Sequence, residues 1–395
     1  MDVMTHRNQL SAQSRSEPVD HKDFRHRYGS TLHVFLWFII SLATIDLAIN
    51  ILFAYPKDPK TQPTSFQAYF DYGRSTEGQL RRMTRPEKDQ TAPITLAGWY
   101  NPLQVKEFAP KTLQSSIVTI YGASHSVNLA TALGRVSNRF TPRSVGGPGA
   151  TSNWAYGAYL RDRGGGKSYA VVLSFQSSTL PMITSLSPIT WNSDAPKPYT
   201  ADRFLLDGNK LRVIQPPYTS FDSYVETLDD PQKWSMAREF FSKHDPFYNS
   251  WVFRENLLDY SSLFRLVRRA YAQHVVRDIK HSVLDQSGFQ PESEPIKVAT
   301  AIIHEFAIRA RRDGSIPVIF MINDLGYSNF LFQALSSAVQ ADNVPYLSSD
   351  AIVPPNDPRG YLPDSHFTIE NDDKLARALE GILENGDNAQ PLSHQ

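Results

Sequence analysis

The chain has 395 residues, of which 41% are hydrophobic, and its 40 Lys and Arg residues balance its 40 Asp and Glu residues. This length supplies one large domain with insertions or two ordinary domains, and the balanced charge argues against a protein that coats nucleic acid. Because the chain contains no cysteine, it excludes disulfides, cysteine-ligated metals and thiol nucleophiles, so a covalent catalyst must be Ser, Thr, Lys, Asp, Glu, His or Tyr.

The first predicted element is a membrane span over residues 34–54, which contains no Lys or Arg. Its roughly 20 residues match a hydrocarbon core of about 30 Å at 1.5 Å per residue. Trp37 and Tyr55 lie near its ends, where aromatic side chains anchor spans at the membrane interface. A buried core helix and a cleaved signal peptide are the alternatives, and the long preceding tail argues against the signal peptide. We therefore expect a cytoplasmic tail over residues 1–31 and an anchor over residues 32–55.

The orientation follows from the position of the anchor. A single N-terminal span before a long domain usually leaves the short tail in the cytoplasm. We therefore expect a single-pass protein of the inner (cytoplasmic) membrane, with its main domain on the periplasmic or extracytoplasmic side. A chain without cysteine suits that oxidising side, because it cannot mispair. The reversed topology, a membrane hydrolase that faces the cytoplasm, is the alternative.

Residues 56–115 are rich in Pro, Lys, Gln and Thr, which predicts a stalk and packing segment. Pro56, Pro59 and Pro63 stiffen the part next to the membrane. Residues 94–105 are apolar enough to pack on the domain that follows.

Residues 116–384 predict an α/β domain. Short apolar or β-branched runs, typical of buried strands, alternate with segments of helical periodicity. This alternation predicts a three-layer α/β/α fold of flavodoxin-like type, with a central, mostly parallel sheet covered on both faces. The first predicted strand begins at Ile117, and the other three cover residues 169–175, 316–322 and 344–347. The last predicted helix covers residues 372–383.

The alternating pattern is lost between about residues 186 and 295, which predicts an insertion that forms a cap or substrate wall. Within it, residues 257–279 form one helical portion. Its Arg265, Arg268 and Arg269 predict a basic helix face, which we interpret as solvated rather than as an anion site. After the domain, residues 385–395 predict a loose tail.

Candidate catalytic residues follow the predicted strands. Active sites of parallel sheets lie at the carboxyl ends of the strands, where Ser124 follows the first strand and Asp364 and His366 precede the last helix. A hydroxyl needs a base to become a nucleophile, and an imidazole base needs a carboxylate to orient it. The three residues therefore predict acyl transfer. Ser126 is a rival nucleophile, and a plain turn and a helix-entry loop are the structural alternatives for the two segments.

These segments resemble the SGNH (GDSL-like) hydrolases. The family's Gly-Asp-Ser block corresponds to residues 122–124, its loop glycine to residues 149–151, and its final Asp and His block to residues 364–366. The blocks occur in the family's order, and the resemblance covers residues 116–186 and 299–383. It implies the SGNH fold and ester chemistry.

Two blocks depart from the family pattern. The Asp before the nucleophile is Ala123, and the block that normally reads Gly-x-Asn-Asp reads Ser-Phe-Gln-Ser over residues 174–177. The family's Asn donor to the oxyanion is therefore missing, and Gln176, Ser177 or Ser178 would have to replace it. Removing one such donor costs about 2.7–4 kcal/mol in studied hydrolases.

The resemblance implies a role for each matched residue. Ser124 is the nucleophile, His366 is the general base, and Asp364 orients the imidazole. The implied oxyanion hole comprises the backbone N–H groups of Ser124 and Gly149 with Gln176 and Ser177.

The predicted function is that of a membrane-anchored serine esterase, with deacylase or O-acyltransferase activity on an envelope glycan or lipid as variants. No cofactor or metal is expected, because the pairs His244-Asp245 and His304-Glu305 lack a second His at a ligating spacing. No nucleic-acid partner is expected either. The alternative is a catalytically inactive SGNH-like module that binds a glycan or a partner protein of the cell envelope.

Overall fold

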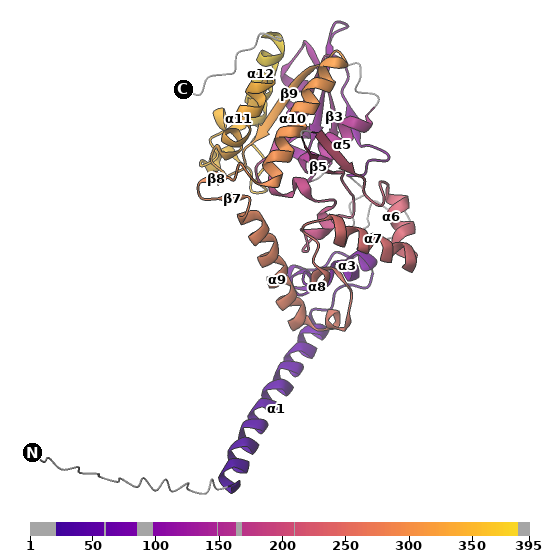
Figure 1. Ribbon diagram of the computed structural model, residues 1–395, viewed down its shortest axis with the longest axis vertical. Coiled ribbons are helices and arrows are strands. Elements are labelled where there is room, and N and C mark those ends of the chain that lie inside the picture. The colour runs from indigo at the N-terminus through magenta and orange to yellow at the C-terminus, as the bar shows by residue number, and fades with distance from the viewer. Residues whose placement is uncertain are drawn as a thin grey trace, which may run out of the picture. The chain divides into compact units, whose positions relative to one another are not determined.

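The computed structural model describes residues 21–58, 61–84, 98–147, 149–162, 168–208 and 210–385 (Figure 1). The chain divides into two compact units, Met1–Ala54 and Tyr55–Gln395. Of the predicted tail at residues 385–395, Asn385 belongs to the last helix and the rest lies outside the described residues, as does most of the predicted tail at residues 1–31.

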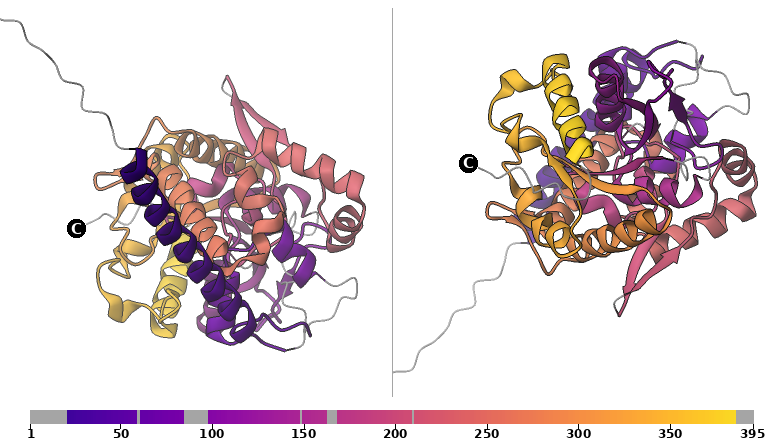
Figure 2. Two further views of the ribbon diagram at one scale, coloured as in Figure 1. Left: turned by 90° about the horizontal axis from the view of Figure 1, so that it is seen from below. Right: turned by 90° about the horizontal axis from the view of Figure 1, so that it is seen from above.

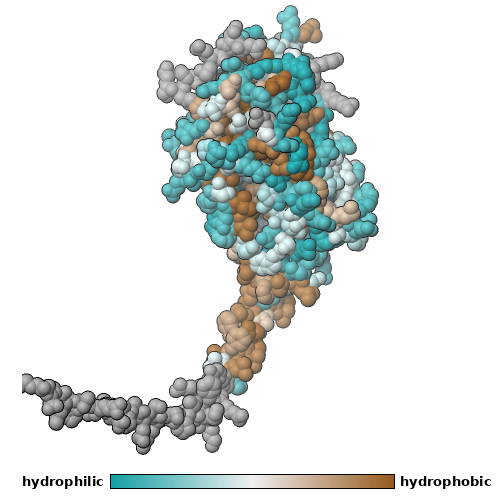
Figure 3. All heavy atoms as spheres, viewed as in Figure 1, coloured by the Kyte–Doolittle hydropathy of each residue, from teal (hydrophilic) through white to brown (hydrophobic). Residues whose placement is uncertain are grey.

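The described part of the first unit consists of helix α1 (His21–Leu52) and the two residues after it. Its segment Thr31–Leu52 has 22 residues and a mean hydropathy of 2.1, so it is long and apolar enough to cross a membrane. None of its most apolar window is buried, unlike a core helix, and apolar side chains cover its length in Figure 3. Thr44 and Asn50 donate hydrogen bonds to carbonyl groups four residues earlier, so their polar groups are satisfied within the helix.

The second unit is built on a six-stranded sheet in the order β1-β3-β2-β4-β9-β10, in which only β1 runs antiparallel to its neighbour. This confirms the predicted α/β class with a mostly parallel central sheet. The chain order of the parallel strands reverses between β2 and β4, which is where doubly wound sheets open a crevice at their carboxyl edge. The strands are β1 (Val105–Glu107), β2 (Ser116–Gly122), β3 (Phe140–Gly146), β4 (Ala170–Gln176), β9 (Ile316–Ile322) and β10 (Tyr346–Ser348).

Strand β3 was not predicted, because its sequence contains Pro142 and Arg143. β1 pairs only with Val145, Ser144 and Arg143, so Pro142 lies beyond the end of β1. The missing N–H of Pro142 therefore costs no ladder bond on that side. The guanidinium of Arg143 forms an ion pair with Asp162.

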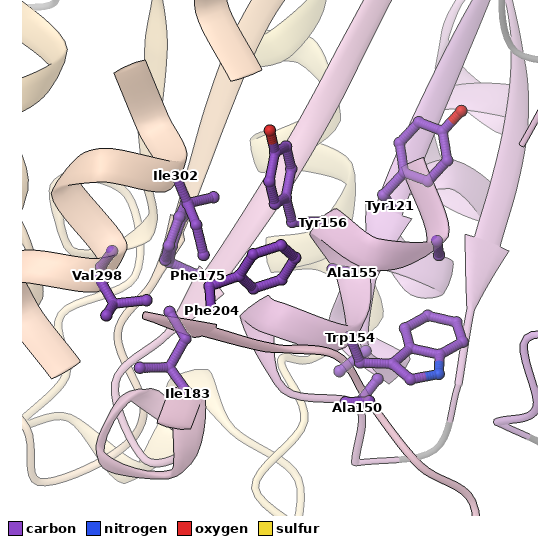
Figure 4. Packing of buried hydrophobic residues seen from close by; sticks show 14 of the residues in the cluster. Tyr121, Ala150, Trp154, Ala155, Tyr156, Phe175, Ile183, Phe204, Val298 and Ile302 are labelled. Carbon is purple, nitrogen blue, oxygen red and sulfur yellow. The ribbon is translucent and has the colours of Figure 1, made fainter. Parts of the chain in front are cut away.

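Helices cover both faces of the sheet, because alternate residues of the buried strands point to opposite sides. Val172 belongs to the hydrophobic cluster under α4 and α12, whereas Val171 and Leu173 belong to the cluster under α5, α10 and α11. Figure 2 shows yellow α12 and orange α10 on opposite sides of the strands, and Figure 4 shows Trp154, Phe175 and Ile302 in the second cluster. These helices are α4 (Ser124–Val136), α5 (Ser152–Arg161), α10 (Glu294–Arg312), α11 (Phe330–Ala341) and α12 (Ile369–Asn385).

The predicted insertion is more helical than its sequence indicated. It contains two short hairpins and four α-helices, of which the helical portion at residues 257–279 corresponds mainly to α9. Phe221 and Tyr224 of α6 pack with Trp99, and Phe241 of α7 packs with Tyr218, which precedes α6. The elements are β5 (Arg203–Asp207), β6 (Lys210–Ile214), α6 (Phe221–Asp229), α7 (Pro231–His244), α8 (Ser250–Phe253), α9 (Ser262–His281), β7 (Leu284–Asp285) and β8 (Gly288–Phe289).

Two helices, α2 (Ser65–Asp71) and α3 (Thr76–Met83), occupy part of the segment where we predicted a stalk. The carboxylate of Glu77 in α3 is buried and accepts a hydrogen bond of 2.6 Å from the indole N–H of Trp234. The segment therefore packs on the insertion through partners that are far away in sequence. Among the described residues, the 3₁₀ helices are η2 (Leu180–Thr184), η3 (Pro188–Thr190), η4 (Leu257–Tyr260), η5 (Ser349–Ala351) and η6 (Pro358–Gly360).

The interpretation of the α9 arginines as a solvated face is wrong. Arg265 and Arg268 are buried, and Arg269 forms an ion pair with Asp194. Arg268 pairs with the fully buried Asp259. Burial of an arginine requires such partners, and these partners were not recognisable from the helix alone.

Candidate active site

Ser124 lies at the junction of β2 and α4. Gly122 ends the strand, and a Cβ atom on it would lie 2.1 Å from Oγ of Ser126. Ala123 occupies the N-cap position and has no side chain to cap the helix. The first turn's backbone hydrogen bonds begin at the N–H of Ser126. The N–H groups of Ser124 and His125 therefore precede the helix's own ladder, where a helix start can receive a negative charge.

The structure brings Ser124, His366 and Asp364 together. Oγ of Ser124 lies 2.7 Å from Nε2 of His366, although the two residues are 242 positions apart in sequence. Nδ1 of the same ring lies 3.0 Å from Oδ2 of Asp364. This chain of two contacts is the arrangement in which an imidazole accepts a proton from a hydroxyl while a carboxylate holds its other nitrogen.

A tight turn allows Asp364 and His366 to meet although only one residue separates them. Ser365 adopts the left-handed region, with φ of 68°. The backbone N–H of His366 donates to Oδ1 of Asp364 at 3.2 Å, and the N–H of Leu362 donates to the carbonyl of His366 at 2.7 Å. The N–H and the ring of His366 together hold the pKa of Asp364 below its usual value, so the carboxylate stays ionised.

Asp324 is a site residue that the sequence analysis missed. It follows β9 and is buried, with Oδ1 accepting 2.7 Å from Nε2 of Gln176. Oδ2 accepts 2.8 Å from Oγ of Ser177 and 2.8 Å from the backbone N–H of Ser178. The structure thus places Gln176 and Ser177 at the carboxyl edge of the sheet, with their side chains donating to Asp324. The available signal was that Asp324 follows a buried strand on the same edge.

His125 packs between this carboxylate and the imidazole of His366. Its ring centroid lies 4.8 Å from that of His366 and 4.7 Å from that of Phe367. Its Nε2 lies 4.0 Å from Oδ1 of Asp324. Burial lowers the pKa of His125 to about 4. The His125 ring is therefore neutral at pH 7, and it packs against the His366 ring without placing a positive charge beside it.

The rival nucleophile, Ser126, is fully buried, and its Oγ lies 2.6 Å from Oγ of Ser174. Gly149 has φ of 68°, and a Cβ atom on it would lie 3.2 Å from Nζ of Lys197. Its loop starts beside β2, because the N–H of Gly147 donates to the carbonyl of Gly122 at 3.3 Å. No hydrogen bond joins Gly149 to Ser124 within the described parts of the chain.

A pocket of about 360 Å³ lies where the insertion meets loops from the carboxyl edge of the sheet. Pro181 follows the β4 loop, and Tyr327 lies three residues after Asp324. Trp191 and Lys280 contribute the insertion side, where burial lowers the pKa of the Lys280 ammonium. The remaining lining residues are Asn192, Ser193, Asp194, Ala272, Gln273, Val276, Arg277, His281 and Leu284.

The candidate metal pairs lie elsewhere. Asp245 is buried and accepts hydrogen bonds from Ser185 and from the backbone of Leu186. Nδ1 of His304 lies 2.7 Å from Oδ1 of Asp342 in a half-exposed ion pair. Among the residues that the structure describes, no group of three or more His, Asp or Glu side chains is placed to hold a metal ion.

No protein-family model and no curated protein sequence matches this chain.

Proposed function

We propose that the protein is a membrane-anchored serine esterase of the SGNH type. The observation that carries the proposal is the hydrogen-bonded chain from Ser124 through His366 to Asp364. The place of Ser124 supports it, since this residue follows β2 at the point where the strand order reverses. Helices on both faces of the sheet also agree with the three-layer SGNH fold that the sequence blocks imply.

In this proposal, Nε2 of His366 takes the proton of the Ser124 hydroxyl while Oγ attacks the ester carbonyl. Asp364 stabilises the resulting imidazolium through Nδ1. The tetrahedral intermediate collapses, and His366 returns the proton to the departing alcohol. Water then hydrolyses the acyl-serine by the same proton transfers. A sugar hydroxyl in place of water would make the reaction an O-acyl transfer.

The oxyanion in this proposal is bound chiefly by backbone donors. The N–H groups of Ser124 and His125 lie at the uncapped start of α4, and Gly149 contributes a third N–H from its loop. Gln176 and Ser177, which the family pattern suggested as side-chain donors, instead fix Asp324. In this proposal, the two side chains hold Asp324 in place beside His125, and they do not bind the oxyanion directly.

The apolar helix α1 is the reason to propose a substrate that lies near a membrane. Its segment Thr31–Leu52 meets the length and hydropathy requirements for a span, and a domain tethered there acts at short range from the bilayer. We propose an ester on an envelope glycan or lipid as the substrate, with the domain on the extracytoplasmic side of the cytoplasmic membrane.

The test is ester hydrolysis by the full-length protein in detergent, with 4-nitrophenyl acetate as the probe. We expect Ser124→Ala and His366→Ala to lower kcat/KM by at least about 10³-fold. Ser282→Ala and His274→Ala are the matched controls, because both residues lie on the surface of α9 or at its end, and they should retain full activity. A folded protein without turnover would instead support the inactive binding module.

A further inference from the structure

Helix α9 is amphipathic in the reverse sense. Its buried face carries Arg265 and Arg268, the latter only 1% exposed. Beside this buried row, on the exposed side of the helix, lie Phe264 and Val267, which are 50% and 57% exposed, and Tyr271, which is 40% exposed. A surface helix normally turns its apolar stripe inward and its charges toward water. The arrangement in α9 therefore indicates that something other than water covers its outer face.

Buried polar contacts prevent α9 from rotating its apolar face inward. Arg268 pairs with Asp259 and donates 2.9 Å to Oδ1 of Asn256. The same Asp259 accepts 2.9 Å from the N–H and 2.5 Å from Oγ of Ser75. Rotation would leave these charges unpaired, and breaking a buried ion pair is strongly destabilising.

Exposed apolar side chains form a row on α9 and occur again in the segment just before it. Tyr260 and Leu257 of η4 precede α9 and are 71% and 85% exposed. Within α9, the spacings of three and four residues from Phe264 to Val267 and Tyr271 keep these side chains on one face of the helix. Single exposed apolar residues need no explanation, but a contiguous row marks an interaction surface. We refer to this row as the outer stripe; it comprises Leu257, Tyr260, Phe264, Val267 and Tyr271.

Contacts within the second unit join α9 to Tyr55, which lies just after the apolar helix in the sequence. The guanidinium of Arg82 at the end of α3 lies 3.7 Å from the ring of Tyr55. Tyr55 follows Leu52, the last residue of the apolar helix, by three positions, which span at most roughly 11 Å. Arg82 pairs with Asp71, which lies 3.9 Å from Arg265 of α9. Within the second unit, Asp71 and Arg82 thus link α9 to Tyr55, the residue at which this unit begins.

We propose that the outer stripe lies in the lipid interface of the membrane that α1 crosses. Tyr and Phe are side chains that favour this interface, where a ring meets lipid and a hydroxyl meets water. The domain would then be attached at two places, the anchor and the stripe, which fixes its orientation toward the bilayer. The proposal rests on the proposed membrane anchoring and is independent of the esterase chemistry.

The absence of cysteine makes a direct test possible, since each introduced thiol is unique. Phe264→Cys and Val267→Cys place a nitrobenzoxadiazole label on the outer stripe. Met236→Cys in α7 and Ile308→Cys in α10 are matched controls, because both side chains are exposed apolar residues on other helices. Each labelled full-length protein is placed in phosphatidylcholine nanodiscs with and without lipids that carry a nitroxide on the acyl chain.

We expect the stripe labels to emit at shorter wavelength than the controls and to be quenched at least twofold more by the nitroxide lipids. Equal quenching at all four positions would overturn the proposal. A wavelength shift without lipid quenching would also overturn it, because it would indicate cover by protein, such as a second copy of the chain. Circular dichroism identifies any variant that has not folded, and Tyr260→Cys then replaces it. Esterase activity is not part of the readout.

Discussion

The carboxylate of Asp364 lies 3.0 Å from Nδ1 of His366, yet the Asp364 side chain is 67% exposed. Water screens a contact of this kind, so the carboxylate orients the imidazole more than it stabilises the imidazolium. The hydrogen-bonded backbone turn from Leu362 to His366 also helps to orient the imidazole. The three residues of the proposed triad are therefore expected to contribute unequally.

Asp364→Asn tests this inequality. We expect kcat to fall by about 10²-fold, less than for His366→Ala, because the turn still holds the ring and only the carboxylate is lost. Steady-state kinetics with 4-nitrophenyl acetate measure the difference. Equal losses for the two variants would show that the exposed carboxylate is as essential as the base.

Asp324→Asn tests how much the buried carboxylate of Asp324 contributes to stability. Asp324 accepts hydrogen bonds from Gln176, Ser177 and Ser178, and the amide group of Asn would face one of these donors with its own N–H₂. We expect the free energy of unfolding to fall by about 2–3 kcal/mol, since a buried charge-assisted bond is replaced by two opposed donors. Denaturant titration measures the loss. Asp357→Asn is the control at a partly exposed position, where the carboxylate pairs with the exposed Arg359, and it should change stability little.

The buried His125 predicts a pH dependence of stability. Its pKa is about 4 in the folded protein and 6.5 when exposed, so the unfolded chain binds more protons between these values. The contribution of His125 is complete above pH 6.5 and is lost as the pH falls toward 4. Between pH 7 and pH 4.5, we expect the wild-type free energy of unfolding to fall by roughly 2 kcal/mol more than that of His125→Gln. Parallel pH profiles of the two proteins would refute the buried neutral state.

Arg268→Ala tests the buried ion pair that orients α9. We expect a loss of about 3–5 kcal/mol in the free energy of unfolding, because Asp259 would remain buried without its guanidinium partner. Arg269→Ala is the matched control one residue later, where the ion pair with Asp194 is partly exposed and should contribute less than about 1 kcal/mol. Similar losses for the two variants would mean that the Arg268 side chain is not held as described.

The sequence predicted those parts of the fold whose own residues show a clear local pattern. Strand β9 was predicted with its observed bounds, because its run from Ile316 to Ile322 is apolar throughout. Strand β3 was not predicted, since its Pro142 is tolerated only because β1 is short. The burial of Arg268 depends on Asp259 and on Asn256, whose positions relative to α9 come from tertiary packing.

The same distinction applies to the site. Ser124, Asp364 and His366 could be selected because their residue types suit acyl transfer and they flank predicted elements. Asp324 could not be selected in the same way, because its importance arises from β4 and β9 being neighbours in the sheet. Of the donors that bind it, Gln176 ends β4 and Ser177 follows it, and their side-chain directions are set by Asp324 rather than by their own segment.

The most direct test of the central proposal is covalent labelling of the full-length protein with a fluorophosphonate, followed by mass spectrometry of the modified peptide. An activated serine reacts because its base removes the hydroxyl proton. We predict a single modified residue, Ser124, and loss of labelling in folded His366→Ala. Labelling at another serine, or unchanged labelling of Ser124 in His366→Ala, would contradict the proposed mechanism.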